Sequence, residues 1–209
     1  MTSESDAIPY EPALLRAERL LVLAPHPDDE VIGCGGLVAS HLREQRQVRI
    51  VVATDGAEAG DAVRRQAESR RGVEILGGAP IEFLGFPDRA LDAQRDACGG
   101  RLAAVLRDWK PDLVLVPSPV EFHPDHLALS VAFCELVQRD PTLFAELGAT
   151  RVAFYEVGQP LRPNAIVDIT TVAELKYTAI AAHESQLAFR DYGAYTRGLN
   201  AFRAMTMPP

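Results

Sequence analysis

The stretch that decides the fold is R-L-L-V-L-A-P-H-P-D-D-E-V-I-G-C-G-G, residues 19–36. It begins with a short apolar run, 19–24, which predicts a buried β-strand. One imidazole, His26, and three consecutive carboxyl groups, 28–30, follow the run almost directly. Adjacent acids repel one another, and a bound cation would explain why they stand together where the chain leaves the core.

Apolar strands and longer helical segments alternate along the rest of the chain. We predict strands over 48–54, 81–84, 112–118, 151–157 and 165–169, and helices over 35–46, 60–78, 90–110, 125–140 and 171–186. Residues 171–174 fit a capping box, and Gly99-Gly100 is a potential break in the helix over 90–110. The strands show little alternation of apolar and polar residues, which is typical of a sheet covered by helices on both faces.

This pattern predicts one domain over residues 1–209 with a Rossmann-like, three-layer α/β/α fold and a mostly parallel sheet. We expect residues 1–18 to form an irregular lead-in. From residue 187 onward the chain is aromatic, and we expect an irregular end there.

The composition narrows the class of protein. The 209 residues carry a net charge of −8 and no Lys/Arg run, so we expect no nucleic-acid partner. The polar first twenty residues do not resemble a signal peptide, and no apolar run reaches the ~18 residues that a membrane helix needs. Cys34, Cys98 and Cys134 are scattered, which is typical of reduced cysteines. We therefore expect a cytoplasmic protein without membrane insertion, acting on a small molecule.

Polar clusters follow three of the predicted strands. They are His-Pro-Asp-Asp-Glu at 26–30, Thr-Asp-Gly at 54–56 and Glu-Phe-His-Pro-Asp-His at 121–126. In open α/β sheets, ligands bind outside the carboxyl ends of the strands. We therefore expect the three clusters to converge on one crevice.

The residue types in these clusters suit a metal hydrolase. A catalytic zinc ion takes three protein ligands and leaves one position for water, and the first cluster offers one histidine while the last offers two. A neighbouring carboxylate can accept a proton from the water, and a further histidine can donate to an oxyanion. Each cluster also has a simpler interpretation: 26–30 as a polar loop, and 123–126 as a helix start with Pro124 at its first position and Asp125 complementing the dipole.

Gly33-Cys34-Gly35-Gly36 suggests a competing site, because glycines between a strand and a helix can hold phosphates. The spacing differs from G-x-G-x-x-G, however, and the preceding carboxylates would repel a pyrophosphate. We favour close backbone packing for these glycines and a buried position for Cys34.

The stretch A-P-H-P-D-D-E-V-I-G-C-G-G at 24–36 resembles the signature of the LmbE-like (PIG-L) family of zinc-dependent N-acetylglucosamine-type de-N-acetylases. The likeness spans roughly residues 19–202 and includes T-D-G at 54–56, R-Q-A-E at 65–68, F-L-G-F-P-D at 83–88, H-P-D-H at 123–126 and A-H-E-S-Q at 182–186. In one departure, Gly158-Gln159 follows Val157 where many relatives have Trp. Without that ring, the substrate pocket could have a different shape from that of these relatives.

By this resemblance, His26, Asp29 and His126 would bind Zn²⁺, although Fe²⁺ or Co²⁺ would also suit such a set. Asp28 would act as the general base and then as the acid toward the leaving amine. His123 would polarise the amide carbonyl and stabilise the oxyanion. The implied reaction is removal of an acetyl group from an N-acetylglucosamine-type amino sugar or its conjugate.

Supporting roles follow for five more residues. Glu30 and Asp125 would orient the metal-binding loop, and Arg65, Asp88 and His183 would contact substrate. The alternatives are a surface acid at Glu30, an Arg65 ion pair with Glu68 on the same helix, a turn residue at Asp88 and a structural imidazole at His183.

Two other functions stay open. An amidohydrolase acting on a non-sugar N-acyl metabolite would use the same machinery. A Rossmann-like protein that binds a nucleotide without hydrolysing anything would use the glycine-rich turn instead.

Overall fold

The computed structural model describes residue 13 and residues 15–205. In this part of the chain the strands are β1 (Arg19–Ala24), β2 (Gln47–Thr54), β3 (Ile81–Phe86), β4 (Leu113–Pro117) and β5 (Arg151–Tyr155). They form one sheet in the order β3-β2-β1-β4-β5, and every pairing is parallel. The predicted Rossmann-like α/β architecture is confirmed.

The strand order indicates where a ligand site is expected. From β1 the chain builds outward through β2 to β3, and then returns to add β4 and β5 on the other side of β1. The order therefore reverses between β1 and β4, which are neighbours in the sheet. In open parallel sheets such a reversal is the usual ligand site.

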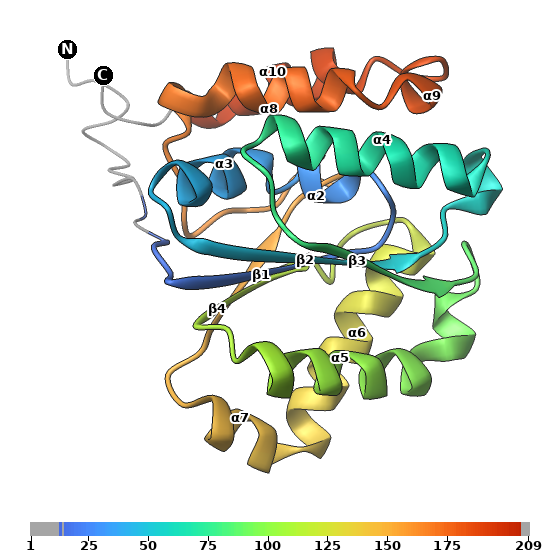
Figure 1. Ribbon diagram of the computed structural model, residues 1–209, viewed down its shortest axis with the longest axis vertical. Helices are drawn as coiled ribbons and strands as arrows, with labels where there is room; N and C mark the ends of the chain where they lie inside the picture. Colours follow the sequence, from blue (N-terminus) through green and yellow to red (C-terminus); the bar gives the residue numbers. More distant parts are fainter. Residues whose placement is uncertain (1–12, 14, 206–209) are drawn as a thin grey trace.

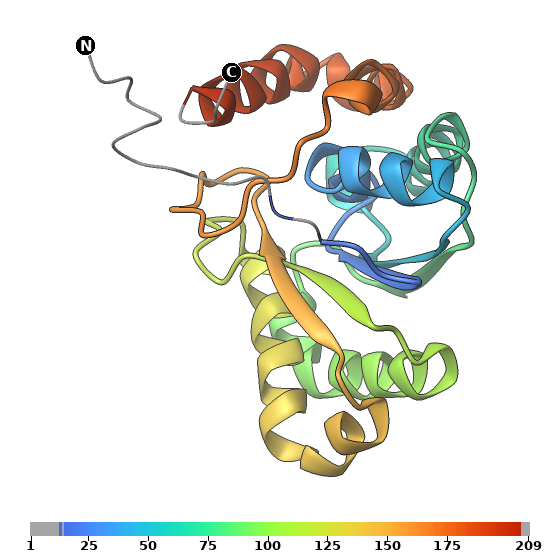
Figure 2. The ribbon, with the colours of Figure 1, turned by 90° about the vertical axis from the view of Figure 1, so that its left-hand side faces the viewer.

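Helices cover both faces of the sheet, as Figure 1 shows. One face carries α2 (Asp29–Ile32), α3 (Gly35–Arg43) and α4 (Ala62–Ile75), and the other carries α5 (Arg95–Trp109), α6 (Pro124–Arg139) and α7 (Pro141–Leu147). The helices α8 (Ala173–Ala181), α9 (Glu184–Leu187) and α10 (Tyr192–Ala204) lie outside the first group, along the top of Figures 1 and 2, and α8 packs on α3 and α4. Short 3₁₀ turns lie at Ala57–Ala59, Leu91–Gln94 and Thr170–Val172.

The side chains of β1 explain why its sequence is apolar from Leu20 to Ala24. Leu20 and Val22 belong to the core beneath α3, α4 and α8, whereas Leu21 and Leu23 belong to the core beneath α5 and α6. Successive side chains of a strand point to opposite faces, so a strand covered on both sides has no solvent-facing position.

The glycine pair at 99–100 does not break its helix, since α5 runs through it to Trp109. The predicted strand over 165–169 is wrong. This segment is extended only locally, with the carbonyl of Ile166 accepting from the amide of Ala13 at 2.6 Å. Its apolar side chains instead pack on the helix layer, where Ile169 covers Gly36. Strand propensity without a neighbouring strand does not produce a ladder.

The C-terminal region also differs from expectation. The predicted helix over 171–186 is divided into a 3₁₀ turn, α8 and α9. Its capping box is absent, because the residue before α8 is Val172 and makes no side-chain cap. The segment after residue 187 is irregular only as far as Asp191, which caps α10 by accepting from the amide of Ala194. Tertiary contacts, among them the Arg203–Glu156 ion pair, stabilise a helix whose glycines weaken its own propensity.

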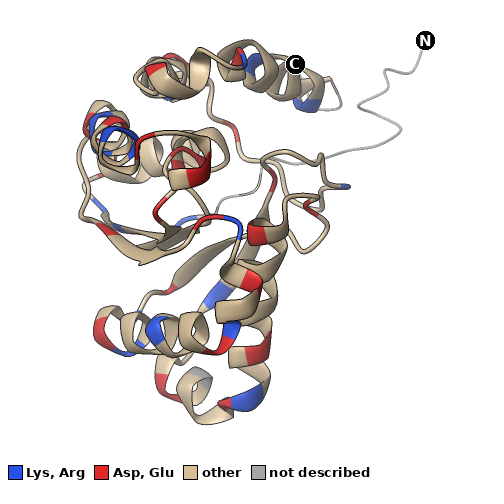
Figure 3. Ribbon diagram, turned by 90° about the vertical axis from the view of Figure 1, so that its right-hand side faces the viewer, with Lys and Arg blue, Asp and Glu red and all other residues tan. Residues whose placement is uncertain are grey.

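The predicted lead-in, residues 1–18, is described only at residue 13 and residues 15–18. These residues contain no helix or strand, and the other positions of the lead-in lie outside the described residues. None of the helices that the structure describes is long and apolar enough to cross a membrane. Acidic and basic residues are interspersed over the outer helices (Figure 3). Some join neighbouring helices, as Arg139 on α6 does with Asp96 on α5 at 2.8 Å.

Candidate active site

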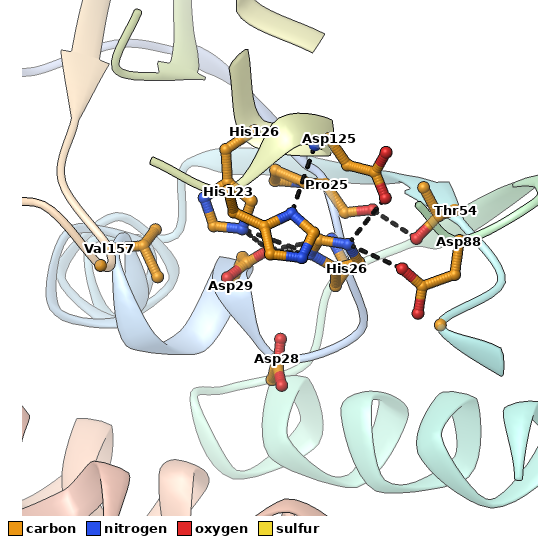
Figure 4. Close-up of polar contacts among 12 residues, drawn as sticks. Pro25, His26, Asp28, Asp29, Thr54, Asp88, His123, Asp125, His126 and Val157 are labelled. Carbon is orange, nitrogen blue, oxygen red and sulfur yellow. Dashed lines mark hydrogen bonds and ion pairs between the residues drawn. The ribbon is translucent and has the colours of Figure 1, made fainter. Parts of the chain in front are cut away.

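The loops that follow β1 and β4 meet at the reversal of strand order, as Figure 4 shows. His26 leaves β1, and α2 begins three residues later at Asp29. His123 is the N-cap of α6, with Pro124 as its first helical residue. The helix-start interpretation of H-P-D-H is therefore correct, and the same helix start brings its histidines to His26.

Three side-chain atoms form a nearly equilateral triangle. Nδ1 of His26 lies 3.1 Å from Oδ2 of Asp29 and 3.2 Å from Nε2 of His126. Nε2 of His126 lies 3.1 Å from the same Asp29 oxygen. Tetrahedral zinc ligands at ~2.0–2.2 Å from the ion lie roughly 3.3–3.6 Å apart, so the triangle needs to widen only slightly to hold such an ion.

Hydrogen bonding fixes which nitrogen of His26 is free. Its Nε2 lies 3.1 Å from Oδ2 of Asp125 and 3.2 Å from Oδ1 of Asp88, so this nitrogen carries a proton and donates. With Nε2 donating, Nδ1 is the nitrogen that faces Asp29 and His126, and it could offer its lone pair to a cation held there. Burial lowers the pKa of His26, but the hydrogen bonds that the ring forms with the carboxylates of Asp125, Asp29 and Asp88 outweigh burial and raise the pKa well above its usual value. Asp125 is itself held by the backbone amides of Arg89 and Leu91 at 2.6 and 3.1 Å.

Glu121 supports His126 from the opposite side, with Oε2 3.4 Å from Nδ1 of the ring. The same carboxylate accepts from the backbone amides of Val157, Gly158 and Gln159 at 2.7, 3.1 and 3.2 Å. It thereby joins the loop after β4 to the loop after β5. Sequence reasoning placed Glu121 in a polar cluster but gave it no role. Its position between a buried strand and H-P-D-H is the signal that was available.

The three consecutive acids are tolerated because each faces a different partner. Asp28 forms an ion pair with Arg65. Burial raises the pKa of Asp29, but the two site imidazoles outweigh that effect and hold the pKa well below its ordinary value. Glu30 is fully enclosed and accepts from the hydroxyl of Ser69 and the amide of Asp28. Burial, with the nearby Asp28 charge, raises the pKa of Glu30 to about 8 against the effect of the Ser69 hydrogen bond.

Arg65 holds only one oxygen of Asp28. Its Nη2 lies 3.1 Å from Oδ2 of Asp28, while Nη1 donates to the carbonyl of Gly56 at 2.7 Å. The guanidinium is buried, and Glu68 pairs with Arg64 and Ser185 instead. Contact between Arg65 and substrate stays a prediction.

His123 is half-buried, and its ring centroid lies 4.6 Å from that of His26. Its Nδ1 accepts from the amide of Asp125 at 3.2 Å, so the proton of the neutral ring is on Nε2. Burial and the neighbouring imidazoles of His26 and His126 lower the pKa of His123. The arrangement favours a neutral ring that donates from Nε2.

His183 is buried, at 2% exposure. Neither ring nitrogen has a hydrogen-bond partner among the residues that the structure describes. The residue lies near Asp28 and Tyr192, and the gap between them is too small to admit a water molecule. The substrate contact of His183 stays a prediction. Asp88 likewise faces His26 from the wall of the site, and its predicted substrate contact also stays a prediction.

The glycine-rich turn is filled by protein side chains. A Cβ atom on Gly33 would lie 2.4 Å from the ring of Tyr155, and one on Gly36 would lie 2.6 Å from Ile169. These glycines therefore allow close packing, and the space beside them is not open to a phosphate. Cys34 is buried among apolar residues.

Residues 21–137 match the family described as GlcNAc-PI de-N-acetylase. A diacetylchitobiose deacetylase of Thermococcus kodakarensis is 33% identical over 81% of this chain and 70% of its own. A 4-oxalmesaconate hydratase of Pseudomonas putida is 30% identical over 85% of this chain and 76% of its own. The solved N,N′-diacetylchitobiose deacetylase from Pyrococcus horikoshii superposes with a TM-score of 0.73 at 29% identity, covering 91% of this chain and 78% of that one.

Proposed function

The chain belongs to the GlcNAc-PI de-N-acetylase (PIG-L) family, a family of N-deacetylases, and we propose that it hydrolyses the acetamido group of an N-acetylglucosamine-type amino sugar or its conjugate. The observation that carries the proposal is the triangle of His26, Asp29 and His126 beside two further groups that suit acid–base work, Asp28 and His123.

The triangle would hold a zinc ion. Two imidazoles and one carboxylate suit Zn²⁺, and Fe²⁺ and Co²⁺ accept the same donors. When bound, zinc supplies Lewis-acid polarisation and lowers the pKa of a coordinated water to ~7. Asp125, Asp88 and Glu121 would keep the two imidazoles oriented with a nitrogen lone pair facing inward.

Asp28 is the proposed general base. Oδ2 is held by Arg65, so Oδ1 is the oxygen that can accept the proton of the attacking water. The same oxygen then gives this proton to the amide nitrogen as the C–N bond breaks, and the products are acetate and the free amine. Glu30 would fix the backbone of this loop through the amide of Asp28. Acid–base help of this kind contributes ~10²–10⁴-fold to the rate.

His123 is the proposed oxyanion donor. Its Nε2 proton would form a hydrogen bond with the carbonyl oxygen and strengthen that bond as negative charge develops. The backbone amide that holds Nδ1 keeps the ring in the donating tautomer.

Metal content and acetate release, measured together, test the proposal. Wild type grown with zinc should hold about one equivalent of metal and release acetate from N-acetylglucosamine conjugates. Asp28→Asn should keep the metal and lose at least ~10²-fold in acetate release. Asp92→Asn, at a side chain that is 73% exposed, is the matched control and should behave as wild type.

Three results would count against parts of the proposal. A wild type without divalent metal would contradict the metal site. Acetate from simple N-acyl metabolites but not from amino sugars would favour the non-sugar amidohydrolase. Metal-dependent turnover without any acetate would point to another reaction class, such as that of the hydratase relative.

A further inference from the structure

An aromatic ring stands exposed at the rim of the site. Phe122 lies between the buried Glu121 and His123, and its side chain is 72% exposed. Both neighbours are held in place, Glu121 by three backbone amides and His123 by the start of α6. A large apolar side chain is therefore presented to solvent on fixed backbone beside the proposed oxyanion donor.

The ring has this position because residue 158 lacks a side chain. A Cβ atom on Gly158 would lie 3.0 Å from both Cε1 and Cζ of Phe122, which is closer than side-chain carbons normally approach. The ring thus lies over the backbone of the loop after β5.

We propose that Phe122 is a specificity-determining residue whose ring stacks on the sugar unit attached to the acetylated one. This inference rests on the proposed deacetylase function. His123 would bind the acetamido carbonyl, so a ring one residue farther out meets the adjoining part of the substrate rather than the acetyl group. An aromatic face offers apolar contact area at low entropic cost, which suits the C–H face of a saccharide.

Steady-state kinetics with N,N′-diacetylchitobiose and with N-acetylglucosamine test this role. For Phe122→Ala, KM for the disaccharide should rise about tenfold, as when one ring contact is lost, with kcat within about twofold. Kinetics with the monosaccharide should stay unchanged. Phe122→Trp keeps an aromatic ring, so its KM for the disaccharide should stay near the wild-type value. Gly158→Ala displaces the ring of Phe122 and should raise that KM.

Phe202→Ala is the matched control, because it removes another exposed ring, 58% exposed on α10. It should leave both substrates unaffected. Three results would overturn the stacking role and leave the deacetylase function intact. Phe122→Ala could change KM equally for both substrates, it could change KM for neither, or the wild type could act on the monosaccharide alone. No acetate from either compound with wild type would overturn the deacetylase function and this inference with it.

Discussion

Lys176 offers a quantitative test of the physical reasoning, because it is a buried amine without a counter-ion. It lies on α8 at 5% exposure, with Cγ packed 3.2 Å from where a Cβ of Gly35 would be. It forms no hydrogen bond or ion pair with the residues that the structure describes. Burial lowers the pKa of Lys176 to about 8, although the nearby Cys34 and Glu156 act in the opposite direction.

The cost to stability follows from linkage. The unfolded chain gives a lysine a pKa of ~10.4, so lowering the pKa to about 8 costs about 3 kcal/mol. The folded-state pKa lies below the unfolded one, so the unfolded state binds more protons between about pH 8 and pH 10.4. Stability therefore rises with pH through that window. Below about pH 8 the full penalty applies.

Replacing Lys176 by Met, which keeps the stem and removes the charge, should raise the free energy of unfolding by about 3 kcal/mol at pH 7. Near pH 10 the gain should fall below about 1 kcal/mol, because wild type then buries a neutral amine. Urea unfolding at both pH values measures the difference. Lys110→Met, the same change at an exposed helix end, is the control and should show little gain at either pH. Equal stabilisation at both pH values, or none, would refute the assignment of a costly buried charge.

Three further results should follow from the structure. Asp125→Asn weakens the orientation of a proposed metal ligand, so metal affinity in a chelator competition should fall about 10–100-fold. His123→Ala should lower kcat by about 10²–10³-fold while the metal content stays at the wild-type level, which would separate an oxyanion donor from a ligand. Gly36→Ala places a methyl group 2.6 Å from Ile169 and should cost about 1–3 kcal/mol in urea unfolding, whereas Gly100→Ala, with open space in α5, should gain up to about 1 kcal/mol.

The sheet could be predicted from the sequence because its strands are buried on both faces. The run 19–24 is buried and apolar from Leu20 to Ala24, and this signal is independent of what lies nearby. The segment 165–169 is also mostly apolar but forms no ladder with a neighbouring strand, which only tertiary structure decides. The helix over Tyr192–Ala204 depends on the opposite effect, since contacts with Glu174 and Glu156 stabilise residues of modest propensity.

The location of the site could be predicted for a topological reason. Parallel strands bring their carboxyl ends to one edge, so His26 and His126 meet although 100 residues separate them. The roles of individual atoms could not be predicted. The free nitrogen of His26 depends on Asp88 and Asp125, and the pairing of Asp28 with Arg65 depends on where α4 lies. These contacts join elements whose separation no local pattern specifies.

The carboxylate of Glu121 has a consequence for how such a protein can diversify. By holding three successive amides at 157–159, it makes the first residues after β5 part of the same rigid unit as His126. Residues 160–165, beyond this tether, lie outside the helices and strands. Insertions there would change the loop while the imidazole keeps its place. A change at position 121, in contrast, would alter the loop and the imidazole together.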